Sequence, residues 1–263
     1  MTVVTTATVD GLDLALDDTG QGRPMLLLHG WCSARATFAR QIDHFAPRLR
    51  TIAVDLPGHG ASAKPERGYS IAFFADTIAG LIDALGLGPQ VVLVGHSMGG
   101  TIALEMARRR PDAHAAVIML DPAPILPPPP VRASLERSLA AMHTHGIKPT
   151  LRMLWEKVMF RPTDPDDLRD EVWRVGQATP DHVVLSAWQA MLDWDGAAAL
   201  DGCTVPLLYV AAERPQSDPA AIRAAKPGIH WGQTVGAGHF NHVVAAAQAN
   251  AMMEAFLELE GLV

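Results

Sequence analysis

Residues 95–99, Gly-His-Ser-Met-Gly, have the composition and spacing of a nucleophilic serine site. They follow a short apolar, β-branched run at residues 91–94, and helical periodicity begins after Gly99 and stops before Pro111. A strand that turns sharply into a helix at Gly-x-Ser-x-Gly holds its serine in a strained turn at the carboxyl edge of a sheet. The alternative, an incidental serine in a Gly-rich turn, would not require a strand before it and a helix after it. We therefore predict that Ser97 is a nucleophile.

A serine nucleophile needs a general base and donors for the oxyanion. His239 follows the Gly-rich residues 236–238 and the last predicted strand, 230–235, so we predict that it accepts the proton of Ser97. The predicted oxyanion donors are the main-chain N–H groups of Met98 and Trp31. His29 is expected to brace the loop of Trp31. His242 is expected to line or cap the closing helix, and most of the remaining histidines outside these motifs (His44, His114, His143, His145 and His182) to be solvated.

The elements that would position these groups alternate between strand and helix. A hairpin is predicted over residues 2–17 around Asp10-Gly11, and a helix over 70–85 with Ser70 as N-cap and Gly86 at its end. Alternation of this kind predicts a mostly parallel sheet, with ligands beyond the carboxyl ends of its strands. Further strands are predicted at residues 25–28, 51–54, 91–94, 115–120, 205–212 and 230–235, and further helices at 219–226 and 241–259.

A helical insertion is predicted between two of these strands. Six prolines lie between Pro122 and Pro130 and indicate a stiff boundary, and helical periodicity fills residues 131–200, with one helix start at Thr163-Asp164-Pro165. Four of the six tryptophans fall in this segment. Trp155 and Trp188 are predicted to face a pocket, with Trp31 as a further wall. An apolar lid suggests a hydrophobic or aromatic substrate.

Four motifs in this order resemble those of the α/β-hydrolase family: His29-Gly-Trp31, Asp55-x-x-Gly-x-Gly-x-Ser62, Gly95-x-Ser97-x-Gly99 and Gly236-Ala-Gly-His239. The resemblance covers essentially the whole chain. It implies an eight-stranded, mostly parallel sheet flanked by helices, with a lid inserted after the sixth strand. The core domain would comprise residues 1–121 and 201–263, and the lid residues 122–200. It also implies a triad in the chain order serine, acid, histidine.

The acid is where the sequence departs from the family pattern. The family usually has an aspartate after the seventh strand, but Pro215 stands roughly at that place. Glu213 is nearby with a longer reach, and Asp218 suits the N-cap of the helix that begins at Pro219. Relatives also use the end of the sixth strand, where this chain has Asp121. We predict Asp121 as the acid, with Glu213 and then Asp218 as alternatives.

Composition restricts the class of partner. The chain has 263 residues, 49% of them hydrophobic, and a net charge of −7 without a basic block, so neither nucleic acid nor a membrane surface is expected as a partner. No signal peptide and no membrane-spanning run is expected, and Cys32 and Cys203 suit reduced thiols of a cytoplasmic protein. No metal site and no cofactor is predicted. The expected partner is a small hydrophobic or aromatic substrate, with a homodimer left open.

Three functional classes fit these features. The first is a serine hydrolase that cleaves an ester, lactone or carbon–carbon bond through an acyl-enzyme. The second is a cofactor-independent dioxygenase of the quinolone-cleaving type, which resembles this chain in residues 29–32, His-Gly-Trp-Cys, and in an acid after the sixth strand. The third is a non-catalytic small-molecule binding protein. The intact serine motif favours the hydrolase.

Overall fold

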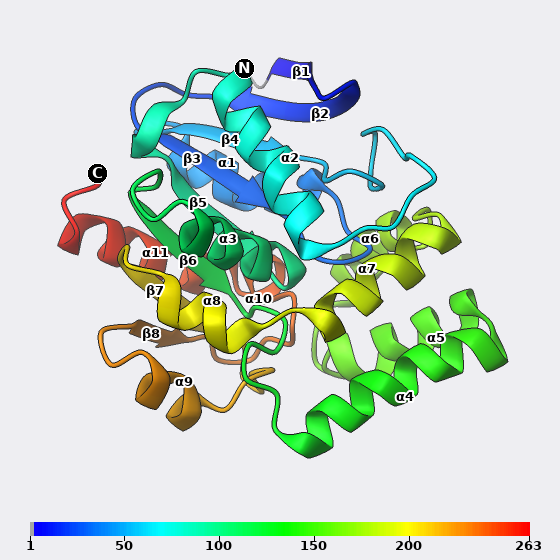
Figure 1. The fold of residues 1–263 in the computed structure, drawn as a ribbon. Helices are drawn as coiled ribbons and strands as arrows, with labels where there is room; N and C mark the ends of the chain where they lie inside the picture. Colours follow the sequence, from blue (N-terminus) through cyan, green and yellow to red (C-terminus); the bar gives the residue numbers. More distant parts are fainter. Residues whose placement is uncertain (1–2) are drawn as a thin grey trace.

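Eight strands form one twisted sheet in the order β1-β2-β4-β3-β5-β6-β7-β8 in the computed structural model, which describes residues 3–263 (Figure 1). β1 and β2 form the predicted hairpin around Asp10 and Gly11, which both have positive φ, and β2 is also antiparallel to β4. All other neighbours are parallel, which confirms the predicted fold class. The strands are β1 (Val3–Val9), β2 (Leu12–Thr19), β3 (Pro24–Leu28), β4 (Arg50–Val54), β5 (Val92–His96), β6 (Ala116–Leu120), β7 (Leu207–Ala211) and β8 (His230–Gln233).

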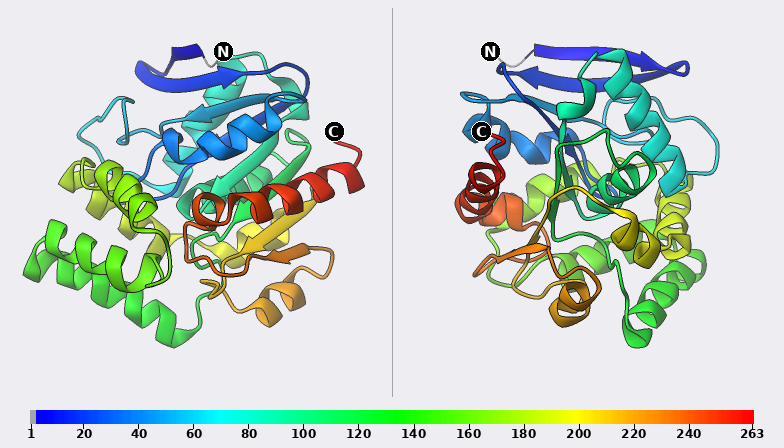
Figure 2. Two further views of the ribbon diagram at one scale, coloured as in Figure 1. Left: turned by 180° about the vertical axis from the view of Figure 1, so that it is seen from behind. Right: turned by 60° about the vertical axis from the view of Figure 1, so that its left-hand side comes forward.

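Helices cover both faces of the sheet, because its central strands are apolar on both sides. In β5, Val92 and Val94 pack toward one face and Leu93 toward the other, and all three are fully buried. Helices α1 (Ala39–Phe45) and α11 (Ala246–Leu259) cover the first face, and Figure 2 shows them together in the view from behind. The second face carries α2 (Ile71–Ala84), α3 (Met98–Arg109) and α8 (Gly196–Gly202).

Of the elements between β6 and β7, four helices and a π-helical turn that precede α8 gather at one end of the molecule (Figures 1 and 2). We call the segment from Pro129 to Asp193 the lid segment. The predicted division into a core (1–121 and 201–263) and a lid (122–200) stays a prediction. The elements of the lid segment are α4 (Pro129–His145), α5 (Ile147–Leu154), the π-helical turn η3 (Trp155–Met159), α6 (Asp166–Gly176) and α7 (Asp181–Asp193).

Some element ends differ from the sequence expectation. Helix α4 begins inside the proline run, at Pro129, because the first turn of a helix needs no N–H donors. The predicted closing helix is interrupted at Ala245 without a proline or glycine to mark the break, and α10 (Asn241–Val244) precedes α11. Within residues 3–263 no helix is long and apolar enough to cross a membrane. The remaining short elements are η1 (Arg35–Phe38), η2 (Gly88–Gln90) and α9 (Pro219–Ala225).

Candidate active site

Ser97 occupies a sharp turn between β5 and α3. Its φ of 51° and ψ of −119° lie in a backbone region that residues other than glycine rarely adopt. Its main-chain N–H donates to Leu120 O at 3.2 Å. A Cβ on Gly95 would lie 2.2 Å from the main chain of Gly99, and one on Gly99 would lie 2.0 Å from Leu28 O. Neither position has room for a side chain, and the turn presents Ser97 at the carboxyl end of β5.

His239 and Asp121 form a buried hydrogen-bonded pair beside this turn. Nδ1 of His239 lies 2.6 Å from Oδ2 of Asp121, and the two residues are 5% and 0% exposed. Asp121 follows β6, which is hydrogen-bonded to β5, and its Oδ1 accepts the main-chain N–H of Ala212 at 3.1 Å. A carboxylate can only accept, so it fixes the proton of His239 on Nδ1 and leaves Nε2 free to accept one.

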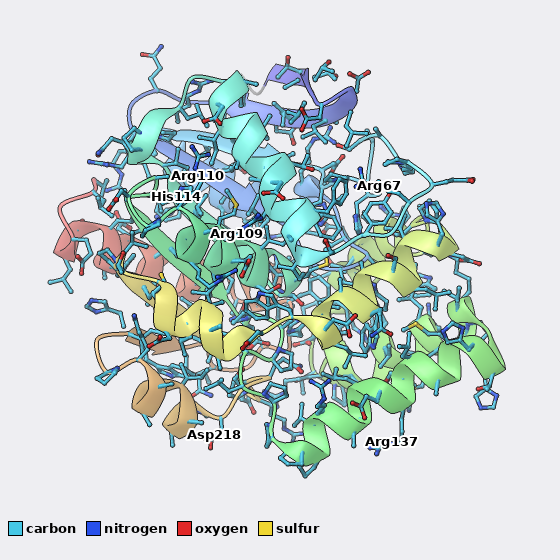
Figure 3. All side chains as sticks on the ribbon, viewed as in Figure 1. Arg67, Arg109, Arg110, His114, Arg137 and Asp218 are labelled. Atoms are coloured by element: carbon cyan, nitrogen blue, oxygen red, sulfur yellow. The ribbon has the colours of Figure 1, made fainter. Side chains whose placement is uncertain are left out.

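The two other candidate acids lie elsewhere. Glu213 accepts the main-chain N–H of Gly236 at 3.0 Å and forms an ion pair with Arg161 of the lid segment. Asp218 caps α9, accepts the N–H of Ala220 at 2.9 Å, and lies on the outside of the molecule (Figure 3). Neither carboxylate contacts His239 in the described chain, so the geometry brings only Asp121 to the histidine.

The main chain of His239 is held on both sides. Its N–H donates to Met159 O at 2.8 Å, and its carbonyl oxygen lies 3.0 Å from Nε2 of His96. Burial, together with the neighbouring histidines, holds the pKa of His96 well below its usual value, so its ring is neutral and donates from Nε2. His96 occupies the unspecified position before Ser97 in Gly-x-Ser-x-Gly, and no sequence signal singled out this contact.

The loop after β3 lies directly against Ser97. A Cβ on Gly30 would be 2.9 Å from Cβ of Ser97, so the loop that carries Trp31 approaches the turn closely. His29 accepts the N–H of Leu56 through Nε2 at 3.0 Å and donates from Nδ1 to Gly30 O at 2.8 Å, which confirms its bracing role. The N–H groups of Trp31 and Met98 donate to no other group in residues 3–263. Their role as oxyanion donors stays a prediction.

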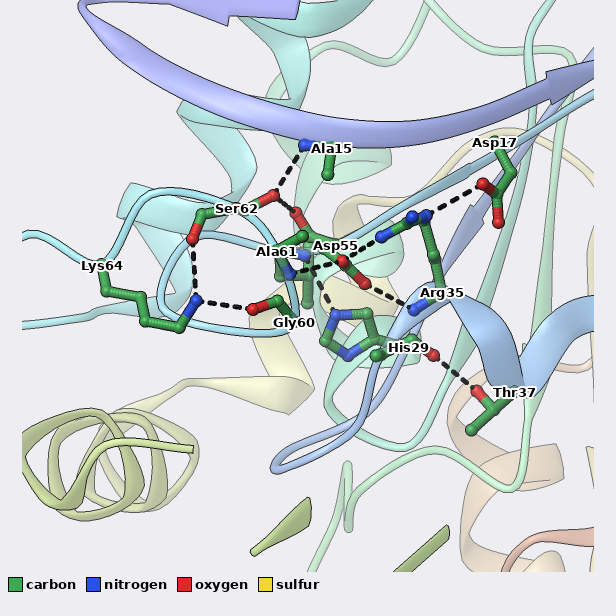
Figure 4. Close-up of polar contacts among 12 residues, drawn as sticks. Ala15, Asp17, His29, Arg35, Thr37, Asp55, Gly60, Ala61, Ser62 and Lys64 are labelled. Atoms are coloured by element: carbon green, nitrogen blue, oxygen red, sulfur yellow. Dashed lines mark hydrogen bonds and ion pairs between the residues drawn. The ribbon is translucent and has the colours of Figure 1, made fainter. Parts of the chain in front are cut away.

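The Asp55 motif has a structural role in the adjoining loop (Figure 4). The Asp55 carboxylate accepts the main-chain N–H groups of Arg35 and Ala61, each at 2.8 Å, and forms an ion pair with the Arg35 guanidinium. A Cβ on Gly60 would lie 2.1 Å from this carboxylate. Ser62 accepts the N–H of Ala15 at 2.9 Å, so the motif ties the loop after β4 to β2 and to the segment after β3.

A cavity of about 410 Å³ lies between the sheet edge and the lid segment, and both Ser97 and His239 line it. Trp31 forms one wall, with its ring centroid 4.6 Å from that of Trp188 and 6.0 Å from that of Trp155. All three indoles therefore lie where the sequence predicted, although their contact with substrate stays a prediction. Further lining residues include Leu135, Met159, Met191, Trp194 and Phe240, and polar ones such as Arg132, Asp195 and Gln216.

Outside this cavity, one histidine and both cysteines are buried and have shifted pKa values. His114 is buried rather than solvated, and burial with the nearby Arg110 lowers its pKa to about 4; Figure 3 marks both residues. Cys32 and Cys203 are buried and unpaired, and burial raises the pKa of both thiols. No set of three His, Cys, Asp or Glu side chains in the part of the chain that the structure describes is arranged to hold a metal ion.

A serine at a strand-to-helix turn and a buried His–Asp pair at the neighbouring strand ends define the α/β-hydrolase class. Comparison with known proteins agrees. The family described as the alpha/beta hydrolase fold matches residues 23–246, and the chain belongs to this family.

Proteins similar to this chain include hydrolases and esterases. The chain is 40% identical over 115 residues to the 2-(acetamidomethylene)succinate hydrolase of Mesorhizobium japonicum, covering 44% of this chain but only 41% of that relative. It is 34% identical to the pimeloyl-[acyl-carrier protein] methyl ester esterase of Chromobacterium violaceum, covering 76% of this chain and 80% of the esterase. An esterase from Exiguobacterium antarcticum has the same fold, with a TM-score of 0.86 at 22% identity over 97% of this chain and all of the esterase.

Proposed function

We propose that this protein is a serine hydrolase that cleaves esters, lactones or carbon–carbon bonds of small hydrophobic or aromatic substrates. The observation that carries the proposal is the 2.6 Å bond between His239 Nδ1 and Asp121 Oδ2, because His239 lines the same cavity as Ser97. An oriented imidazole next to a strained serine is the arrangement that acyl transfer requires. The similarity of this chain to an esterase over most of both chains also supports a hydrolase.

Each group has a defined role in the proposed reaction. Nε2 of His239 removes the proton from Ser97 Oγ as the hydroxyl attacks the substrate carbonyl carbon. The oxyanion then accepts hydrogen bonds from the N–H groups of Trp31 and Met98, and Asp121 stabilises the imidazolium. The imidazolium returns the proton to the leaving group, which leaves an acyl-enzyme on Ser97. Water attacks the acyl-enzyme with His239 again as base, and free Ser97 is restored.

The cavity supports the proposed substrate class. Its walls beside Ser97 are mostly apolar, with three indoles and the side chains of Met159 and Met191, so they favour an aromatic or branched acyl group or ring. A volume of about 410 Å³ limits the substrate to a small molecule. No cofactor is required for this chemistry.

The test combines labelling with a substrate panel. A fluorophosphonate should form one adduct, at Ser97, and p-nitrophenyl esters should be hydrolysed by the wild-type protein and not by Ser97→Ala. Absence of both the adduct and ester hydrolysis in the folded wild type would refute the proposal.

The His239–Asp121 pair would serve a second reaction equally well, because it can deprotonate a bound substrate directly. This is the base required by a cofactor-independent dioxygenase. If Ser97→Ala retained turnover of a hydroxyquinolone under oxygen, that reaction would replace the hydrolase proposal. Saturable ligand binding without turnover in either assay would instead favour a binding protein.

A further inference from the structure

The loop that carries His239 is attached directly to the lid segment. Two successive main-chain N–H groups of this loop donate to it: that of Gly238 to Oδ1 of Asp164 at 3.3 Å, and that of His239 to Met159 O at 2.8 Å. No other part of the described chain accepts these two protons.

Local structure explains why Met159 and Asp164 are available as acceptors. The π-helical turn η3 ends at Met159, and the backbone of the next residue, Phe160, is extended, so the carbonyl of Met159 has no partner within the helix. The carboxylate of Asp164 folds back onto the N–H of Arg161, with Oδ2 at 2.7 Å, which leaves Oδ1 turned to Gly238. Asp164 is 3% exposed, although its sequence context resembles an ordinary helix start.

The contact is tight on the side of the loop as well. A Cβ on Gly238 would lie 2.7 Å from Asp164 Oδ2, 2.9 Å from Met159 O and 3.1 Å from Arg161 N. Gly238 has no positive φ, so its lack of a side chain serves this close approach and not a special backbone conformation.

We infer that Asp164, together with the Met159 carbonyl, is a positioning element for His239, and that the base is correctly placed only while this part of the lid segment is seated. The inference rests on the proposed function of His239. Asp121 fixes the imidazole at Nδ1, but the direction of Nε2 also depends on where the Cα of His239 lies. The lid segment fixes that position through two N–H groups. The lid segment thus does more than enclose the substrate.

The test is Asp164→Ala, with Asp166→Ala as the matched control. Asp166 lies two residues away, is exposed, and within residues 3–263 pairs only with Arg169. A base displaced by about 1 Å costs on the order of 10²-fold in rate. We expect Asp164→Ala to lower kcat for an acetate ester by about that factor with little change in KM, and Asp166→Ala to stay within twofold of wild type. Asp164→Asn, which keeps a carbonyl acceptor, should recover part of the loss.

Two readouts separate this inference from the proposed function. The rate of labelling by a small fluorophosphonate reports the activation of Ser97 without filling the lid pocket, and it should fall with kcat. The downfield proton resonance of His239 Nδ1–H, bound to Asp121, should weaken or shift in Asp164→Ala even if the protein hydrolyses no ester. If the proposed function is wrong, the wild-type protein itself will show neither ester hydrolysis nor labelling. If only the inference is wrong, the wild type will behave as expected and the variants will not.

Gly238→Ala approaches the same contact from the other side and carries the test if Asp164→Ala does not fold. The added methyl group must push the lid segment away, so the same loss of kcat and labelling rate is expected. Wild-type kcat, labelling rate and proton resonance in the folded variants would overturn the inference. So would a rise in KM alone, or an equal loss in Asp166→Ala.

Discussion

Backbone strain is concentrated at or beside the residues proposed to carry the chemistry. Of the four non-glycine residues with positive φ in residues 3–263, Ser97 and Asp121 belong to the proposed triad, Cys32 follows Trp31, and Asp10 lies in a hairpin turn. Each such conformation costs on the order of 1–3 kcal/mol and persists only where the surroundings enforce it. The sheet supplies that enforcement, because Ser97 N–H bonds to Leu120 O and Asp121 N–H bonds to Val210 O.

Asp121→Asn tests the proposed acid. Asparagine can turn its amide N–H₂ toward His239, which would favour the wrong tautomer of the imidazole. In a serine protease the equivalent change lowers kcat by about 10⁴-fold. We expect a loss of similar size here, measured as kcat on a p-nitrophenyl ester, together with slower fluorophosphonate labelling of Ser97.

Glu213→Gln is the comparison for that experiment. The amide oxygen still accepts the N–H of Gly236, so only the charge toward Arg161 is lost, and kcat should fall by less than about tenfold. A collapse of kcat in Glu213→Gln with an active Asp121→Asn would return the acid to the loop after β7. Small losses in both would direct attention to Asp218.

The sequence predicted the features that depend on residues close together in the chain. The Gly95–Gly99 turn, the hairpin and the Ser70 cap, whose side chain accepts the N–H of Phe73 at 3.0 Å, follow from residue types at fixed offsets. The sequence ranked Asp121 first but left Glu213 and Asp218 open, because the choice depends on which strand end faces His239 across 118 residues. The contact of Asp164 with Gly238, across 74 residues, was missed for the same reason.

At the scale of elements, the lid segment is tied to the core by hydrogen bonds as well as by apolar packing. The indole N–H of Trp31 donates to Val184 O of α7 at 2.9 Å, and that of Trp194, the residue directly after the lid segment, donates to the Glu105 carboxylate of α3 at 3.2 Å. Glu105 is itself held by Arg108 on the same helix. Because α3 begins directly after Ser97, these contacts fix the pocket walls relative to that residue.

Trp155→Leu and Trp188→Leu test whether the indoles of the lid segment recognise substrate. Both changes enlarge the cavity beside Trp31, so KM for benzoyl or long acyl esters should rise by about tenfold, with less than a twofold change for acetate esters. Trp188 also donates its N–H to Leu135 O of α4, whereas the buried N–H of Trp155 has no partner in the described chain. Trp188→Leu should therefore also lower the midpoint of thermal unfolding more. Equal losses on all esters would mean that the indoles only hold the lid segment together.

At the scale of the whole molecule, buried histidines make stability depend on pH. Burial is the main cause that lowers the pKa of His59 and His242 to about 3 and that of His114 to about 4. In the unfolded chain these rings titrate near 6.5, so between that pH and their folded pKa values the unfolded state binds protons that the folded state does not. Stability is therefore unaffected by these groups above pH 6.5 and falls as the pH drops below it. At pH 5 each ring contributes a loss of about 2 kcal/mol.

His242→Phe isolates one of these groups. The ring is fully buried, neither nitrogen has a hydrogen-bond partner in the described chain, and its centroid lies 5.0 Å from that of Phe38 and 4.2 Å from that of His96. Phenylalanine keeps the packing and removes the proton-binding site. The free energy of unfolding, measured with urea at pH 7 and pH 5 at constant ionic strength, should therefore fall by about 2 kcal/mol less in the variant than in the wild type. His145→Gln, at an exposed position, is the control measured in the same way. A wild-type pH dependence in His242→Phe would mean that His242 is already protonated in the folded protein, with solvent or a carboxylate reaching it.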